Sequence, residues 1–200
     1  MDSPRRLVYG VGINDADYNT HKYITEDGKC KLVWRCPYYQ RWKTMLKRCY
    51  SDKYQSINPT YLGCSTCDDW LTFSRFKAWM ENQDWECKQL DKDLLIEGNK
   101  VYSPDTCIFV LQIVNVFTID SGAARGDYML GVCWDKGTGK FLSRCCNPFT
   151  GKREHLGRFT NEIEAHLAWK TRKHELACQL ADSELISDPR LAEALRTRYL

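Results

Sequence analysis

The sequence predicts an α+β protein made of two small modules in tandem. Apolar residues recur at helical spacing in two segments of the first half, and three strand-like runs separated by glycine-containing turns occur in the second. A small, polar stretch at residues 120–126 lies between them and has the composition of a linker. The expected order is an N-terminal arm (1–36), a first module (37–120), a second module (121–182) and a C-terminal helix (183–200).

In the first module a helix is expected to begin after Pro37, because proline suits the first turn of a helix. A loop over residues 51–63 should separate it from a second helix. Gly98 and Asn99 predict a turn, hence a hairpin between residues 90–95 and 101–102, followed by a short apolar helix over 107–117. The expected core residues of the two long helices are Tyr38, Trp42, Met45, Leu46, Cys49, Trp70, Phe73, Phe76, Trp79 and Met80.

In the second module three strands are expected within residues 128–134, 140–146 and 155–159. A helix should follow, with Thr160 or Asn161 as its N-cap, and a last amphipathic helix is expected near the C-terminus.

Composition narrows the class of protein. The chain of 200 residues has no apolar run near the ~20 residues needed to span a bilayer and no signal-peptide core, so we expect a cytoplasmic protein that does not bind membranes. Eleven cysteines, an odd number, fit free thiols or metal ligands better than a disulfide framework. The net charge is only +3, but basic residues gather with aromatic ones in residues 35–48 and 136–158, which is typical of a nucleic-acid surface or of a solvated basic face.

Residues 37–118 carry an ordered series of motifs. They are Trp42-x-x-Met45-Leu46-x-Arg48-Cys49-Tyr50, Tyr61-x-x-Cys64-x-x-Cys67-x-x-Trp70, Phe73-x-x-Phe76, Leu90-Asp91-Lys92-Asp93, Gly98-Asn99-Lys100-x-Tyr102-Ser103-Pro104-x-x-Cys107 and Asn115. This series resembles the HNH-like proteins of phages and bacterial mobile elements, many of them homing endonucleases. The resemblance implies a ββα-metal module, in which a hairpin and a helix hold one divalent cation beside the scissile phosphate.

The resemblance also implies site residues. Asp91 or Asp93 would be the carboxylate of the hairpin and Asn115 the last metal ligand, with Mg²⁺ or Mn²⁺ as cofactor. Asn99 and Thr106 lie where the structural asparagine of the motif is expected. The usual catalytic histidine is absent, since no histidine lies in residues 37–118, and Lys92 occupies the position beside Asp91. Lysine is protonated at neutral pH and is a poor general base unless its pKa is depressed, so Lys92 would act catalytically only if it replaces that histidine. The alternative is that these residues only cap a hairpin.

A zinc site is a separate possibility. Cys64 and Cys67 have zinc-knuckle spacing, and Cys49 and Cys107 could complete a four-cysteine structural site. Buried, reduced cysteines are the alternative.

The second module carries the motifs Gly126-x-Tyr128-x-x-Gly131-Val132-x-Trp134, Gly139-Lys140-Phe141, Leu156-Gly157-x-Phe159 and Glu164-Ala165-x-x-Ala168-Trp169. They are similar to the Apetala/ethylene-response-factor (ERF) DNA-binding domain. This similarity implies a three-stranded antiparallel sheet packed on one helix, with the sheet in the major groove of double-stranded DNA. The residues expected to contact DNA are Arg125, Trp134, Lys136, Lys140, Arg144, Lys152 and Arg153.

Together these observations predict a phage-type DNA-binding protein that acts as a metal-dependent homing endonuclease or nickase. One site per chain would nick, and a double-strand break would need a homodimer or a second event. The alternative is a catalytically inactive HNH-like protein that serves as a phage regulator or inhibits a host defence protein. RNA binding is permitted by composition, but no RNA-module motif supports it.

Overall fold

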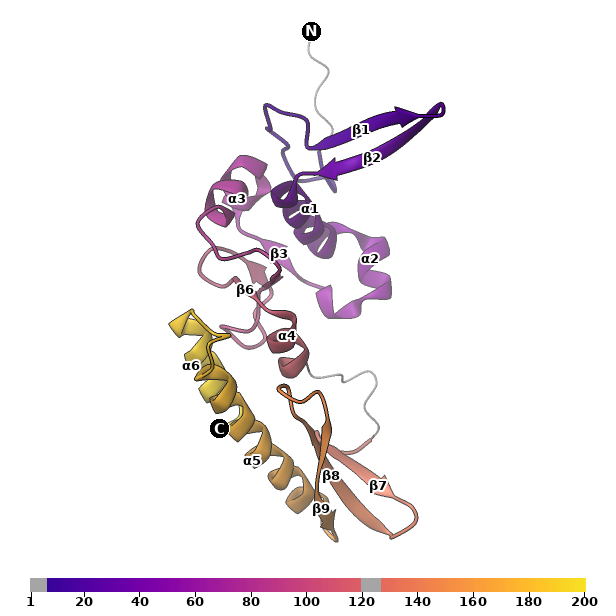
Figure 1. Ribbon diagram of the computed structural model, residues 1–200, viewed down its shortest axis with the longest axis vertical. Coiled ribbons are helices and arrows are strands. Elements are labelled where there is room, and N and C mark those ends of the chain that lie inside the picture. The colour runs from indigo at the N-terminus through magenta and orange to yellow at the C-terminus, as the bar shows by residue number, and fades with distance from the viewer. Residues whose placement is uncertain (1–6, 120–126) are drawn as a thin grey trace. The chain divides into compact units, whose positions relative to one another are not determined.

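The computed structural model describes residues 7–119 and 127–200, and the chain divides into two compact units between Phe109 and Val110 (Figure 1). The expected linker at 120–126, including Arg125, lies outside the described residues. Each unit is therefore considered by itself.

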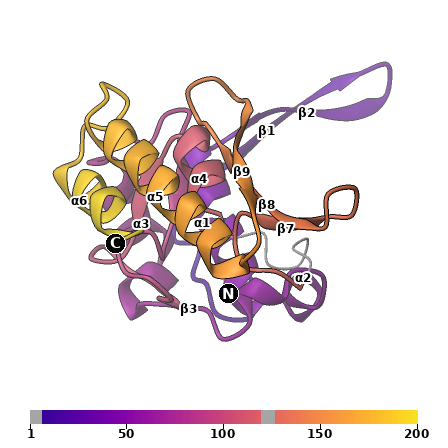
Figure 2. The ribbon, with the colours of Figure 1, turned by 90° about the horizontal axis from the view of Figure 1, so that it is seen from below.

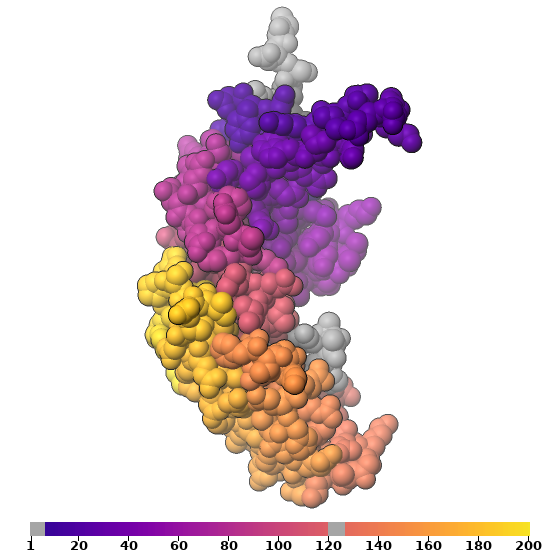
Figure 3. All heavy atoms as spheres, viewed as in Figure 1, coloured from indigo at the N-terminus to yellow at the C-terminus, as the bar shows by residue number. Residues whose placement is uncertain are grey.

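Within the expected N-terminal arm, residues 21–35 form a hairpin. Strands β1 (His21–Glu26) and β2 (Lys29–Arg35) pair antiparallel and project from the rest of the first unit (Figures 1 and 3). Their two-residue turn is Asp27-Gly28, with φ of 50° and 71°. Aspartate and glycine tolerate positive φ at both positions, and such a turn matches the twist of paired strands.

The core of the first unit is aromatic, as expected. Helix α1 (Pro37–Tyr50) begins at Pro37 and buries Trp42 and Leu46, and α3 (Phe73–Met80) packs against it. The Trp42 Nε1–H donates to the carbonyl oxygen of Trp70 at 2.7 Å, so this buried polar group is satisfied. Trp70 lies in the short helix η2 (Asp68–Leu71).

The expected loop at 51–63 is instead largely helical. Helix α2 (Asp52–Ile57) is capped by the Ser51 side chain, which accepts from the Tyr54 N–H. A single helical turn, η1 (Pro59–Tyr61), follows with proline at its start. The prediction overlooked this serine cap and the proline as signals of helix starts.

The expected hairpin between 90–95 and 101–102 is wrong. Strand β4 (Gln89–Asp91) pairs with β6 (Ile108–Val110), while β5 (Val101–Tyr102) pairs in parallel with β3 (Ser65–Thr66). The turn at Gly98-Asn99 therefore belongs to a long loop that leaves one sheet and enters another. The helix expected over 107–117 likewise begins as strand β6 and becomes α4 (Gln112–Thr118) only afterwards.

The second unit confirms the three-stranded antiparallel sheet on one helix. The sheet has the order β7 (Val132–Asp135), β8 (Lys140–Cys146), β9 (Arg153–Phe159), and α5 (Glu162–Ala181) lies alongside β8 and β9 (Figure 2). Asn161 caps α5 by accepting from the Ile163 N–H. The last helix, α6 (Pro189–Thr197), packs on α5.

The mixed α+β class is thus confirmed. In the part of the chain described, no helix combines the length and apolarity needed to cross a bilayer.

Candidate functional site

The two faces of the β7–β9 sheet differ in chemistry. Cys145 and Glu154 are register partners on the face toward α5, where Cys145 is buried and Glu154 forms an ion pair with Arg172 of that helix at 2.7 Å. Because side chains alternate along a strand, Lys140, Arg144 and Cys146 lie on the opposite face. That second face, called here the outer face, is the one available to a ligand.

The outer face carries exposed cations. Arg144 pairs in register with His155, and Arg153 pairs with Cys146, so both arginines lie on this face together with the imidazole. Neither arginine forms an ion pair with a carboxylate in the described part of the chain. Uncompensated arginines on a sheet face are suited to phosphate oxygens and to the edges of guanines.

Lys140 is also exposed on the outer face, while Lys136 lies in the turn after β7 and Lys152 immediately precedes β9. Trp134, expected to contact DNA, does not lie on the outer face. Its register partner is Phe141, and the two rings are 4.9 Å apart on the face toward α5.

Two outer-face residues were missed in the sequence. His155 belongs there as the partner of Arg144, and Arg158 belongs there as the partner of Leu142, which is itself buried. The register shifts between these pairs, so His155 and Arg158 share a face although they are three residues apart. Arg158 donates to Asp135 at 2.9 Å, and this hydrogen bond lowers the pKa of Asp135 to about 2. The charge of Arg158 is therefore already offset within the sheet.

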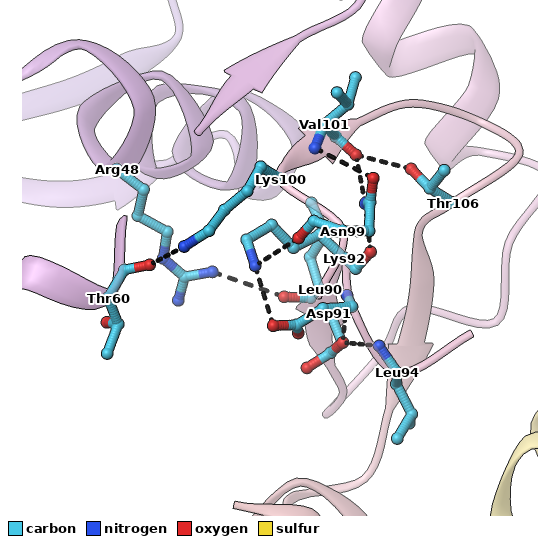
Figure 4. Close-up of polar contacts among 11 residues, drawn as sticks. Arg48, Thr60, Leu90, Asp91, Lys92, Leu94, Asn99, Lys100, Val101 and Thr106 are labelled. Carbon is cyan, nitrogen blue, oxygen red and sulfur yellow. Dashed lines mark hydrogen bonds and ion pairs between the residues drawn. The ribbon is translucent and has the colours of Figure 1, made fainter. Parts of the chain in front are cut away.

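The loop after β4 gathers four predicted site residues (Figure 4). Asp91 Oδ1 accepts from the backbone N–H groups of Asp93 and Leu94, at 3.0 and 2.8 Å. The buried Lys92 donates to Asp93 Oδ2 at 3.0 Å and to the carbonyl oxygen of Asn99 at 3.1 Å. Lys92 thus ties the two ends of the loop together and has its ammonium engaged by two acceptors.

The Asn99 side chain also holds the two ends of the loop together. Its Nδ2 donates to the carbonyl oxygens of Lys92 and Val101, at 2.6 and 2.7 Å, and its Oδ1 accepts from the Val101 N–H at 3.2 Å. A single side-chain amide therefore replaces the strand pairing that the hairpin prediction had assumed.

The loop brings two carboxylates close together, and the ammonium of Lys92 offsets the charge of Asp93. Burial raises the pKa of Asp91, and the nearby charge of Asp93 raises it further. A divalent cation would relieve both effects, and Mg²⁺ is commonly held by one or two carboxylates together with phosphate oxygens. Asp91 and Asp93 fit that mode of binding. Asn115 lies on α4, in the second unit.

Arg48 was not among the expected site residues. It extends from α1 toward the loop, where its Nη1 donates to the carbonyl oxygen of Leu90 at 3.4 Å (Figure 4). Its guanidinium lies 5.2 Å from the centre of the Tyr61 ring. Its Nε has no partner among the described residues although it is buried. The separation of 42 residues between Arg48 and Leu90 explains why spacing could not reveal it.

The four cysteines considered for zinc lie in the first unit. Cys49, Cys64 and Cys107 are buried in the aromatic core, and Cys67 is half-buried against it. Burial, followed by neighbouring thiols, raises the pKa of Cys49 to about 12, and burial raises that of Cys107 to about 12. Within residues 7–119 and 127–200, no three His, Cys, Asp or Glu side chains are arranged as a metal-ligand set. Their burial places these thiols in the hydrophobic core, and the zinc site stays a prediction.

No protein-family model matches this sequence, and neither a curated protein nor a solved structure shows significant similarity to it.

Proposed function

We propose that this protein binds double-stranded DNA through the outer face of the β7–β9 sheet. The observation that carries the proposal is the pair of exposed arginines, Arg144 and Arg153, without carboxylate partners in the described residues. A small sheet of this kind fits a major groove about 12 Å wide. Lys136, Lys140 and Lys152 at the strand ends would add contacts to phosphates.

Removal of the outer-face charges should weaken DNA binding. We expect Arg144→Gln/Arg153→Gln to lower affinity for a duplex about tenfold or more near physiological salt, and to reduce the slope of log K against log salt by about 0.9 for each phosphate that is no longer neutralised. Fluorescence anisotropy over a series of salt concentrations measures both quantities.

A matched control is Arg190→Gln/Arg196→Gln on α6. It removes the same charge, but these arginines already pair with Asp188 and Asp182. An equal fall in affinity in the control would mean that net charge, not the outer face, accounts for binding.

A second proposal concerns catalysis: the loop from Asp91 to Asn99 supports metal-dependent nicking of DNA, as in HNH-like enzymes. It is supported by Asp91 and Asp93 lying next to each other in the loop, by the order β4–loop–β6–α4, and by the arginine that reaches the loop from α1. A bound Mg²⁺ or Mn²⁺ would offset phosphate charge and lower the pKa of its water. In this arrangement Asp91 and Asp93 would bind the cation, Lys92 and Asn99 would hold the loop in shape, and Arg48, which donates to the carbonyl oxygen of Leu90, would supply a positive charge beside the loop.

Asp91→Asn is the variant that tests nicking. Asparagine can keep the Oδ1 acceptor for Asp93 and Leu94 but removes the charge. We expect Mg²⁺- or Mn²⁺-dependent relaxation of supercoiled plasmid to fall at least about a hundredfold, because a metal site contributes several kcal/mol to catalysis. DNA affinity should be unchanged.

Asp105→Asn provides the charge-matched control, since Asp105 is exposed in the turn after β5. If the wild-type protein binds plasmid but never nicks it with either metal, the catalytic proposal is wrong. The non-catalytic regulator or inhibitor of a host protein then becomes the better description.

A further inference from the structure

A concave pocket of about 440 Å³ lies between the β1–β2 hairpin and α1, within the first unit. Its lining includes His21 and Arg35 from the hairpin and Lys43 and Lys47 from α1. Tyr23 of β1 and Tyr54 of α2 contribute rings. This pocket is called here the hairpin pocket, and all of its lining residues come from segments that precede the β7–β9 sheet in the chain.

The fold brings these basic side chains together from separate elements. Lys43 and Lys47 are one helical turn apart on α1, and neither belongs to the buried face that contains Trp42 and Leu46. His21 and Arg35 are register partners at the base of the hairpin. The pairing of β1 with β2 therefore sets a second pair of basic groups opposite the lysines.

The charges are of one sign. No carboxylate lines the pocket, and Arg35, Lys43 and Lys47 form no ion pairs among the described residues. The pKa of His21 is lowered by burial and then by Lys43 and Arg35, which places these cations close enough to repel. Like charges gathered without a counter-charge destabilise the free protein, and an anion would relieve that repulsion.

The aromatic rings in the pocket favour an anion that also has a surface to pack against them. Lys47 Nζ lies 4.6 Å from the centre of the Tyr54 ring, and Tyr23, which also lines the pocket, is exposed on the hairpin. The backbone of a polynucleotide offers phosphates to the cations and sugar surfaces to the rings.

We propose that the hairpin pocket binds the phosphate backbone of DNA, as a second contact surface separate from the β7–β9 sheet. The inference rests on the proposed DNA-binding function and adds to it. Two lysines that neutralise phosphates should contribute mainly to affinity and salt dependence, and little to sequence preference.

The test uses the full chain carrying Lys43→Gln/Lys47→Gln, with Lys53→Gln/Lys170→Gln as control. The control removes the same charge from positions outside the pocket and without ion pairs in the described residues. With a duplex of fixed sequence, we expect the slope of log K against log salt to fall by about 1.8 in the pocket variant, at about 0.9 for each phosphate. Affinity should fall about tenfold or more, with little change in the control.

The outcomes separate the two ideas. If wild-type protein binds DNA and the pocket variant behaves as the control does, the pocket inference is overturned and the sheet proposal stands. If wild-type protein does not bind DNA, both are overturned. A weakening seen only on an RNA duplex of the same sequence would also overturn the inference.

Thermal melting of each variant checks folding. Because the lysines are at least partly exposed, their replacement should leave the melting temperature within a few degrees of wild type.

Discussion

Trp42→Ala should destabilise the first unit by about 3–5 kcal/mol, the range seen when a large buried aromatic is truncated. Trp42 is fully buried, packs against the rings of Tyr39 and Phe73, and donates to the carbonyl oxygen of Trp70. The alanine variant leaves a cavity and an unpaired buried carbonyl group, and both effects act in the same direction. Urea denaturation followed by circular dichroism measures the change.

Two further variants test whether the loss of stability comes from the burial of Trp42. Trp42→Phe keeps most of the ring but removes the donor, so its cost should be intermediate. Trp34→Ala removes the same side chain from β2, where it is 39% exposed, and should cost far less. A similar cost for Trp34→Ala and Trp42→Ala would contradict the burial that assigns Trp42 to the core.

Gly131→Ala should destabilise the sheet of the second unit by about 2–4 kcal/mol, from positive-φ strain together with overpacking. Gly131 has φ of 76°, and a Cβ there would collide with Cβ, Cγ and Cδ1 of Trp169 on α5. These atoms are near the backbone of Trp169 and cannot swing away easily. The carbonyl oxygen of Gly131 also accepts from the Arg144 N–H at 2.9 Å, so displacement should disturb the outer face and weaken DNA binding.

Gly139→Ala is the matched control for Gly131→Ala. Gly139 also has positive φ, 63°, but a Cβ there would meet no atom within 4 Å. It should cost only the backbone strain, about 1–2 kcal/mol. Combining Gly131→Ala with Trp169→Ala should cost less than the sum of the two single changes, because the second change removes the collision. Strict additivity would show that Trp169 is not the reason for glycine at position 131.

The sequence determined the elements that depend on neighbouring residues. Pro37 begins α1, Asn161 caps α5, and the glycine-containing turns separate three strands of the second unit, as expected. The closeness of Asp91, Lys92 and Asn99 also follows from their being within nine residues of one another. The β1–β2 hairpin was predictable as well, since Asp27-Gly28 is a strong local signal for a two-residue turn.

Only the tertiary structure decided the features that join distant segments. Strand β5 pairs with β3, more than 30 residues earlier, because the Asn99 amide supplies the loop with the hydrogen bonds that a local hairpin would have made. The register shift in β9 turns Arg158 to the same face as His155, which strict alternation would not give. The hairpin pocket likewise exists only because strand pairing and helix packing bring His21 and Arg35 beside Lys43 and Lys47. Local propensities fix where helices and turns begin, whereas long-range pairing and burial fix which side chains share a surface.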